Sequence, residues 1–287
     1  MAQSLQETVR EPQGPKSAIR QSLMSPAGKR TVWVVVEAED DYAVYSKFMD
    51  PNTTVVKTSE DREGRKGYAN VEIIVKEIRE EVPVAHIIGI RDADYSKYEN
   101  GFVVGENVFL TDCRDLEMMM LASESVRQAL DEWMSGYEAV LGKCVPICRH
   151  FGYLRIINDV HDLGCTFHDK LRTRMFWDYT HQSLKTDWKE KSTTQFVELT
   201  GGQCDRGALE VFVEEMLLEE GSFYDICRGH DLLPLLSLTM IDTKKYSVDS
   251  IMAKMVATYS LVDFKQTQLY ENIRTWQEVE GINALAA

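Results

Sequence analysis

Three carboxylates in the N-terminal half have the type and spacing of a metal site. Glu37 ends the apolar run TVWVVVE (31–37), and Asp92 and Asp94 follow a second apolar segment, AHIIGI (85–90). Hard cations such as Mg²⁺ prefer oxygen ligands and are typically held by one or two carboxylates together with substrate phosphates. A cation held in this way activates a water and neutralises charge on a phosphodiester. The pattern therefore predicts metal-dependent chemistry on phosphodiesters.

The alternative is that these acids only cap the helices that follow the strands, as Asp often does. Capping suits Asp40 and Asp115 well. Capping explains Glu37, Asp92 and Asp94 poorly, because these acids come at the ends of two strands that are expected to be adjacent. The i, i+2 spacing of the two aspartates also puts both on one side of an extended segment.

The elements that must position these acids alternate between strand and helix. We predict strands at 31–37, 54–58, 85–90 and 107–111, and helices at 40–48, 69–81 and 115–134. This alternation predicts an α/β fold with an open, mostly parallel sheet flanked by helices. Ligands of such sheets bind at the carboxyl ends of the strands, where the acids lie. Asp112, after the fourth strand, is a weaker candidate because a strand-end Asp also caps helices.

The second half of the chain is predicted to be mainly helical. The clearest helices are 213–220, 230–241, 247–261 and 266–279, with Pro234 in the first turn of the second, and 196–202 is expected to be a short strand before a glycine turn. The expected organisation is a flexible tail (1–29), a catalytic α/β domain (30–135) and a helical region (136–287). The pattern leaves open whether that region is a separate domain or a cover on the sheet.

Composition excludes several classes of protein. The 287 residues are 44% hydrophobic, which is ordinary for a folded chain, and no stretch of 18 apolar residues predicts a membrane span. The first 29 residues lack the apolar core of a signal peptide, so we expect a cytoplasmic protein. The net charge of −14 is unusual for a nucleic-acid binder, since phosphate contacts supply most of the affinity. A nucleic-acid substrate would need metal ions, a local basic groove or a partner.

Basic and histidine side chains supply further candidates. Arg62, Arg65 and Lys66 form a dense basic patch that either holds substrate phosphates or is a solvated loop. His230 is a candidate substrate-binding residue and proton carrier, with Asp231 as its orienting acid. We favour Asp231 as a helix cap.

One cluster of cysteines and histidines is a candidate zinc site. Its members lie within 25 positions: Cys144, Cys148, His150, His161, Cys165 and His168. The paired spacing of structural zinc sites is missing, so buried, reduced cysteines and scattered histidines are the better interpretation. The run Met118–Met120 is expected in the core or an interface.

The strand-end segments resemble motifs of a known domain. Residues 31–41, TVWVVVEAEDD, and 86–94, HIIGIRDAD, resemble the two motifs of the TOPRIM domain, found in topoisomerases, primases and OLD-type nucleases. In that domain one apolar strand ends in Glu, usually followed by Gly, and another ends in Asp-x-Asp. Many OLD-like members have an Asp four positions after the Glu, which here is Asp41. This sequence has Ala38 where glycine is usual.

A further segment narrows the resemblance. NVFLTDCRDLEMMML (107–121) resembles stand-alone TOPRIM-like nucleases, the AriB-type effectors of the PARIS anti-phage defence system. GRKGYANV (64–71) and, more loosely, CRGHDLLPLL (227–236) are also similar to that family. The resemblance implies a Mg²⁺-dependent (or Mn²⁺-dependent) endonuclease, a toxin that cleaves RNA, in particular tRNA. It also implies a partner, an ABC-type ATPase of the AriA type, that releases the nuclease.

The resemblance also implies residue roles. Carried over by position, Glu37 is the metal-linked acid and a general acid or base, and Asp92 and Asp94 ligate the ion. Asp41 and Glu117 would hold a second ion or orient the first ligands. Two alternatives remain: an OLD-like DNA endonuclease, and a non-catalytic TOPRIM-fold binding or regulatory subunit. The complete set of three acids argues against the second.

Partner binding is the remaining expectation. An enzyme that cuts RNA freely would harm its own cell, so we expect another protein to restrain it; a homodimer is also possible. The apolar segment 232–241 and the region around Tyr270 and Trp276 either supply a docking face or only cover the sheet.

Overall fold

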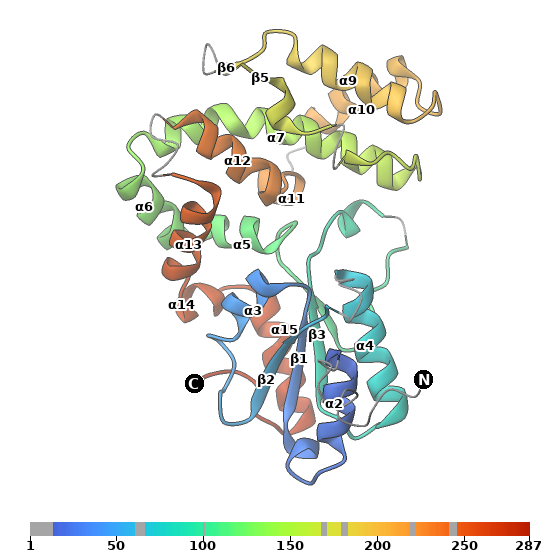
Figure 1. Cartoon of the computed structure of the whole chain (residues 1–287), viewed down its shortest axis with the longest axis vertical. Coiled ribbons are helices and arrows are strands. Elements are labelled where there is room, and N and C mark those ends of the chain that lie inside the picture. Colours follow the sequence, from blue (N-terminus) through green and yellow to red (C-terminus); the bar gives the residue numbers. More distant parts are fainter. Residues whose placement is uncertain are drawn as a thin grey trace, which may run out of the picture. The chain divides into compact units, whose positions relative to one another are not determined.

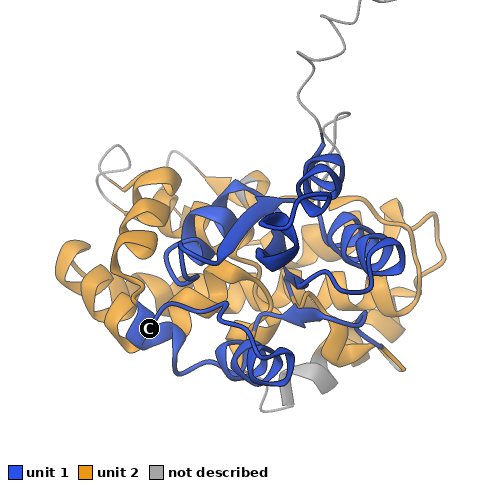
Figure 2. Cartoon of the chain, turned by 90° about the horizontal axis from the view of Figure 1, so that it is seen from below, with its two compact units in different colours: residues 1–92, 103–111, 261–287 blue, residues 93–102, 112–260 orange. Residues whose placement is uncertain are grey.

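The computed structural model describes residues 14–60, 67–99, 101–167, 171–178, 183–218, 222–240 and 246–287. The chain divides into two compact units (Figure 2). Unit 1 comprises residues 1–92, 103–111 and 261–287, and unit 2 comprises residues 93–102 and 112–260. Each unit is built around its own set of elements.

Unit 1 is a parallel sheet flanked by helices, which confirms the predicted α/β class (Figure 1). The four strands are β1 (Val32–Val36), β2 (Thr54–Thr58), β3 (Ile87–Arg91) and β4 (Val108–Leu110), in the order β2-β1-β3-β4. All three pairings are parallel, with Val34 opposite both Val56 and Ile88. Every residue of β1 and β3 is buried, as expected of central strands covered on both faces.

The helices of unit 1 pack on this sheet. They are α2 (Pro15–Leu23), the short 3₁₀ turn η1 (Gly28–Arg30), α3 (Glu39–Tyr45), α4 (Tyr68–Glu81), α14 (Leu261–Phe264) and α15 (Gln268–Glu280). One hydrophobic cluster joins α4 and α2 to the sheet face that carries Trp33 and Val35. The C-terminal segment returns to the sheet, because the Thr54 hydroxyl donates to the carbonyl of Ala284 (3.0 Å).

Unit 2 is mainly helical. Its elements are η2 (Ser96–Tyr98), α5 (Leu116–Ala122), α6 (Glu124–Trp133), α7 (Tyr137–Val160), η3 (Thr173–Phe176), β5 (Trp177–Asp178), β6 (Ser183–Leu184), α9 (Trp188–Leu199), α10 (Arg206–Leu218), α11 (Phe223–Ile226), α12 (Gly229–Thr239) and α13 (Val248–Thr258). The 24-residue α7 packs against α10, α11 and α12. Within the described ranges, no helix combines the length and apolar character that a membrane crossing requires.

The domain boundaries differ from the predicted ones. Within the expected N-terminal tail, Pro15 starts α2, and Ile19 and Leu23 are buried in the hydrophobic cluster of unit 1. Residues 112–135, expected in the catalytic domain, belong to unit 2, and residues 261–287 belong to unit 1. The reason is packing: α5 and α6 contact α13, whereas α15 contacts β4.

Three local predictions were wrong. The single helix expected over 115–134 is two helices, because Ser123 is extended (ψ 133°) between α5 and α6. Residues 196–199 complete α9 rather than forming a strand, since Phe196 shares a buried helical face with Ser192 and Thr193. Pro234 lies inside α12 and not in its first turn, because the helix begins at Gly229.

The apolar segment considered as a docking face is mostly interior. Leu232, Leu233, Leu235 and Leu236 are buried in unit 2, and Trp276 is buried in unit 1. Their burial argues against a docking face. The alternative, a cover on the sheet, fits α15, which contacts β4, but not α12, which packs on α7 and α13 in unit 2.

Gly89 allows α4 to lie close to β3. A Cβ atom at this position would lie 2.6 Å from Cγ1 of Val71, which is closer than van der Waals contact permits. We expect Gly89→Val to lower the free energy of unfolding by about 1–3 kcal/mol, the usual cost of overpacking a core. Thermal or urea denaturation measures this change.

Gly142→Ala is the matched control for that experiment. Gly142 lies in α7 with open space around its Cα, so alanine should be neutral or stabilising by up to about 1 kcal/mol. Equal stability of Gly89→Val and the wild type would show that the α4–β3 contact is not tight.

Candidate functional site

The carboxyl ends of β1 and β3 bring Glu37 and Asp92 together. The two strands are paired neighbours, and each acid is the residue directly after its strand. Oε1 of Glu37 accepts a hydrogen bond from the backbone N–H of Asp92 (2.9 Å). This bond holds the Glu37 carboxylate at the edge where the two strands end.

A buried serine fixes the backbone around Glu37. Ser59 is fully buried, and its hydroxyl donates to the carbonyl of Glu37 (3.0 Å). The same hydroxyl accepts from the N–H of Gly67 (3.3 Å), the residue before α4. Gly67 has a φ of +112°, a conformation that glycine adopts far more readily than other residues. Sequence reasoning missed Ser59, since a serine after a short strand carries no signal of its own.

Asp41 forms a hydrogen bond within the turn that follows Glu37. Its Oδ2 accepts a hydrogen bond from the N–H of Ala38 (2.9 Å), at the N-terminus of α3. Ala38 has φ −144° and ψ −177°, which is ordinary extended backbone, so alanine replaces the usual glycine there without strain. Asp41 thereby orients the residues next to Glu37.

Asp94, the second acid of the Asp-x-Asp segment, belongs to unit 2. It forms an ion pair with Arg114 (Oδ1 to Nη2, 3.2 Å), and its N–H donates to the carbonyl of Arg114 (2.8 Å). The φ of Asp94 is +46°, in the left-handed region that Asp tolerates better than most residues. The Arg114 guanidinium also lies over the ring of Tyr95, 4.5 Å from its centroid.

Asp115 joins the starts of two helices in unit 2. Its Oδ1 accepts from the N–H of Met118 and caps α5 (3.0 Å), as the sequence predicted. Its Oδ2 accepts from the N–H of Gly229 (2.9 Å) and from Arg114 (2.7 Å). Burial and the charge of Glu117 raise the pKa of Asp115 to about 6.

Glu117 and His230 form the second pair of unit 2. Nδ1 of His230 lies 3.0 Å from Oε1 of Glu117, which is buried while the imidazole is exposed. The hydrogen bond to Glu117 raises the pKa of His230. Burial alone would raise the pKa of Glu117, but the hydrogen bond and charge of His230 outweigh burial and lower it. A Cβ atom on Gly229 would lie 2.4 Å from Cβ of Glu117, so this approach requires glycine.

Asp231 neither caps α12 nor orients His230 by a hydrogen bond seen in the structure. Its carboxylate accepts hydrogen bonds from Nε and Nη2 of Arg155, at distances from 2.9 to 3.2 Å. The predicted capping role was wrong because a guanidinium on α7 takes both carboxylate oxygens. Glu117 is the acid that contacts His230.

The remaining predicted residues lie elsewhere. Arg62, Arg65 and Lys66 lie outside the described residues. Met118, Met119 and Met120 are buried, as expected of core residues. Asp112 is half-buried after β4, and its carbonyl accepts from Nζ of Lys97 (3.2 Å).

The cysteines match the expectation of buried thiols. Five of the six are buried, and Cys204 is half-buried. Nε2 of His150 lies 3.0 Å from the Ser192 hydroxyl, and its ring makes edge contacts with Phe151 and Trp188. Burial lowers the pKa of His150 to about 4, so this imidazole is neutral at physiological pH.

The candidate metal ligands do not form a closed cluster within the described part of the chain. Among the described side chains, no group of three or more His, Cys, Asp or Glu residues could hold a metal ion. Glu37 and Asp92 do provide two carboxylates at one strand edge. Mg²⁺ is commonly bound by one or two carboxylates, with water and substrate phosphates completing its shell, so this pair fits that ion.

Comparison with known proteins does not assign a family. No model of a known protein family matches this sequence, and no curated protein matches it.

The Glu117–His230 pair predicts a pH dependence. His230 has a raised pKa in the folded state, so its contribution to stability is complete below its ordinary value of 6.5 and is lost as the pH rises through the raised value. Asp115, with a pKa of about 6, is largely ionised above pH 7 and changes little there. We therefore expect the Tm to fall as the pH rises above about 7, by a component that His230→Gln removes.

Thermal melts of wild type and His230→Gln across this range measure the difference. His161→Gln is the control, because His161 is also exposed and lies beyond the end of α7. Parallel pH profiles for wild type and His230→Gln would show that the ion pair does not form in solution.

Proposed function

We propose that the protein is a metal-dependent endonuclease with a TOPRIM-type site that hydrolyses phosphodiester bonds in RNA, with tRNA as the substrate class. The observation that carries this proposal is the pairing of Glu37 and Asp92 at the adjoining carboxyl ends of β1 and β3. This edge is where parallel α/β sheets bind ligands. The order of the strand-end motifs supports the TOPRIM assignment.

The contacts of each residue suggest its role in the proposed reaction. Glu37 and Asp92 would hold Mg²⁺ or Mn²⁺, which supplies charge neutralisation and an activated water. Glu37 also acts as general acid or base, since its backbone hydrogen bond keeps the carboxylate in one place. Ser59 and Asp41 are positioning residues, because they act on the backbone of residues 37 and 38. Asp94 is proposed as a ligand from its spacing to Asp92 in the sequence.

Glu117 is proposed to orient His230 rather than to hold an ion. Its carboxylate contacts the imidazole at 3.0 Å, and a cation bound in the same place would compete with that bond. His230 is exposed and titratable, which fits the substrate-binding role predicted from the sequence.

We further propose that an ABC-type ATPase restrains the nuclease. The support is the resemblance to defence effectors and the net charge of −14, which gives the chain little general attraction to nucleic acid. Co-purification of the chain with such an ATPase tests this partner.

Cleavage is tested with labelled tRNA and with plasmid DNA, each with and without Mg²⁺. We expect Mg²⁺-dependent cleavage of tRNA, and a loss of about 10²- to 10⁴-fold in Glu37→Gln and Asp92→Asn. Both variants keep the shape of the side chain, so their Tm should stay close to that of the wild type. Glu39→Gln is the control, an exposed acid two residues from Glu37.

Two other outcomes of the cleavage assay would indicate a different function. Cleavage of plasmid alone would indicate a DNA endonuclease. Absence of cleavage of either substrate, with the partner ATPase present or absent, would indicate a binding or regulatory subunit.

Metal binding is measured separately from cleavage, as a change in Tm when Mg²⁺ or Mn²⁺ is added. Two carboxylates at one edge repel each other, and a bound cation removes this repulsion. At a metal concentration of about 100 times Kd, binding stabilises the folded chain by about 2.7 kcal/mol. We expect Mg²⁺ or Mn²⁺ to raise the Tm of wild type and Glu39→Gln, but not that of a Glu37→Gln, Asp92→Asn double variant. An equal rise in all three would place the ion elsewhere.

A further inference from the structure

Tyr68 lies beside the candidate site in unit 1. It is the first residue of α4 and directly follows Gly67, where a Cβ atom would lie 3.8 Å from Oε2 of Glu37. The Tyr68 side chain is 51% exposed although it is large and aromatic. The residue before Tyr68 thus lies beside the carboxylate of Glu37, and the exposed Tyr68 ring is available to a bound substrate.

A buried arginine supports the Tyr68 ring. The Arg91 guanidinium lies 4.7 Å from the ring centroid, within the range of a cation–π contact. Arg91 is only 5% exposed and pairs with Glu72 (Nε to Oε1, 3.0 Å). It is also the last residue of β3, directly before Asp92. The ring is thus held by an arginine that the sheet itself positions.

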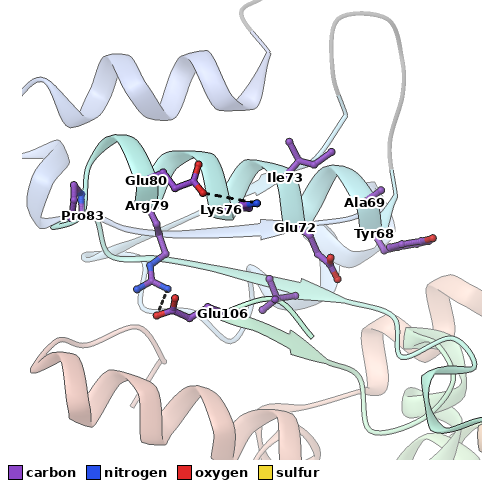
Figure 3. Close-up of a pocket in the computed structure, with 11 residues that line it drawn as sticks. Tyr68, Ala69, Glu72, Ile73, Lys76, Arg79, Glu80, Pro83 and Glu106 are labelled. Carbon is purple, nitrogen blue, oxygen red and sulfur yellow. Dashed lines mark ion pairs between the residues drawn. The ribbon is translucent and has the colours of Figure 1, made fainter. Parts of the chain in front are cut away.

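Tyr68 lines a groove along α4 and the start of β4, shown in Figure 3. This Tyr68 groove has a volume of about 640 Å³, which is in the range of small-molecule sites. Ala69, Ile73, Pro83 and Val108 supply apolar surface. Figure 3 shows Tyr68 at the end of α4 opposite Pro83.

The charges of the Tyr68 groove are balanced. Arg79 pairs with Glu106 (2.7 Å), Lys76 with Glu80 (4.0 Å), and Glu72 with Arg91. A groove with paired charges does not attract a chain of phosphates. It suits an uncharged, flat and partly apolar group, and a nucleobase has this chemistry.

We propose that the Tyr68 groove binds an unpaired base of the substrate, next to the phosphate at Glu37 and Asp92, with the base stacked on Tyr68. The inference rests on the proposed nuclease function and specifies its substrate. A base inside a duplex is stacked on its neighbours and cannot reach such a ring, whereas bases of single-stranded loops stack on aromatic side chains. The enzyme therefore selects unpaired segments of nucleic acid.

The test uses the full chain carrying Glu37→Gln, so that binding is measured without cleavage. The probe is a short single-stranded RNA containing the fluorescent base 2-aminopurine, whose emission is quenched by stacking. We expect Tyr68→Phe to keep both affinity and quenching, and Tyr68→Leu to weaken binding by about tenfold or more and to abolish the quenching. Tyr42→Leu, an exposed tyrosine on α3 outside the groove, is the matched control and should behave as its parent.

A duplex of the same sequence is the second control and should bind much more weakly than the single strand. Equal affinity and quenching in Tyr68→Leu and its parent, or failure of the single strand to bind, would overturn the inference. Cleavage of tRNA by the wild type would still uphold the proposed function in that case. Stacking that depends on Tyr68, without cleavage by the wild type, would overturn the nuclease and leave a nucleic-acid-binding groove.

Discussion

The parallel pairing of β1 and β3 is the constraint on which the candidate site depends. Both strands are buried along their whole length, so a shift in register would disturb packing on both faces of the sheet. Because the register is set, the residues that follow the strands are set as well. Glu37 and Asp92 meet through a 2.9 Å hydrogen bond for this reason, although the two are 55 positions apart in the chain. Ser59 follows β2, and its hydrogen bond to the carbonyl of Glu37 connects the end of this third strand to the same edge of the sheet.

Unit 2 contains ion pairs whose members are buried or half-buried. Arg114 contacts Asp94 and Asp115, and Arg155 contacts Asp231. Burial of an isolated charge is costly, so removing one partner leaves the other uncompensated. This network connects the starts of α5 and α12 through the bond between Asp115 and Gly229. The imidazole of His230 is exposed and pairs with the buried Glu117.

The acidic composition and the balanced groove point to the same kind of recognition. A chain with a net charge of −14 gains little from general attraction to polyanions. The proposed metal at two carboxylates and the proposed stacking on Tyr68 would be short-range contacts that do not need a basic surface. Such contacts favour selection of a particular local structure in the substrate over tight binding to any nucleic acid.

The sequence by itself determined the elements whose signals are local. The apolar, β-branched runs predicted β1 and β3, and the spacing of Val71, Ile74, Val75 and Ile78 predicted the buried face of α4. The strand-end position of Glu37 and Asp92 followed from the same runs. These signals survive because burial on a sheet or helix face repeats along the chain at a fixed period.

Tertiary structure decided what depends on residues distant in the chain. Phe196 and its neighbours have strand-like character but complete a helix, because that helix buries one face. Asp231 has the sequence context of a helix cap. Its carboxylate instead accepts hydrogen bonds from Arg155, which is 76 positions away. The pairing of Glu117 with His230 and the ring of Tyr68 over Arg91 have no local pattern either. Such contacts are set by which faces pack together, and only the folded chain settles that.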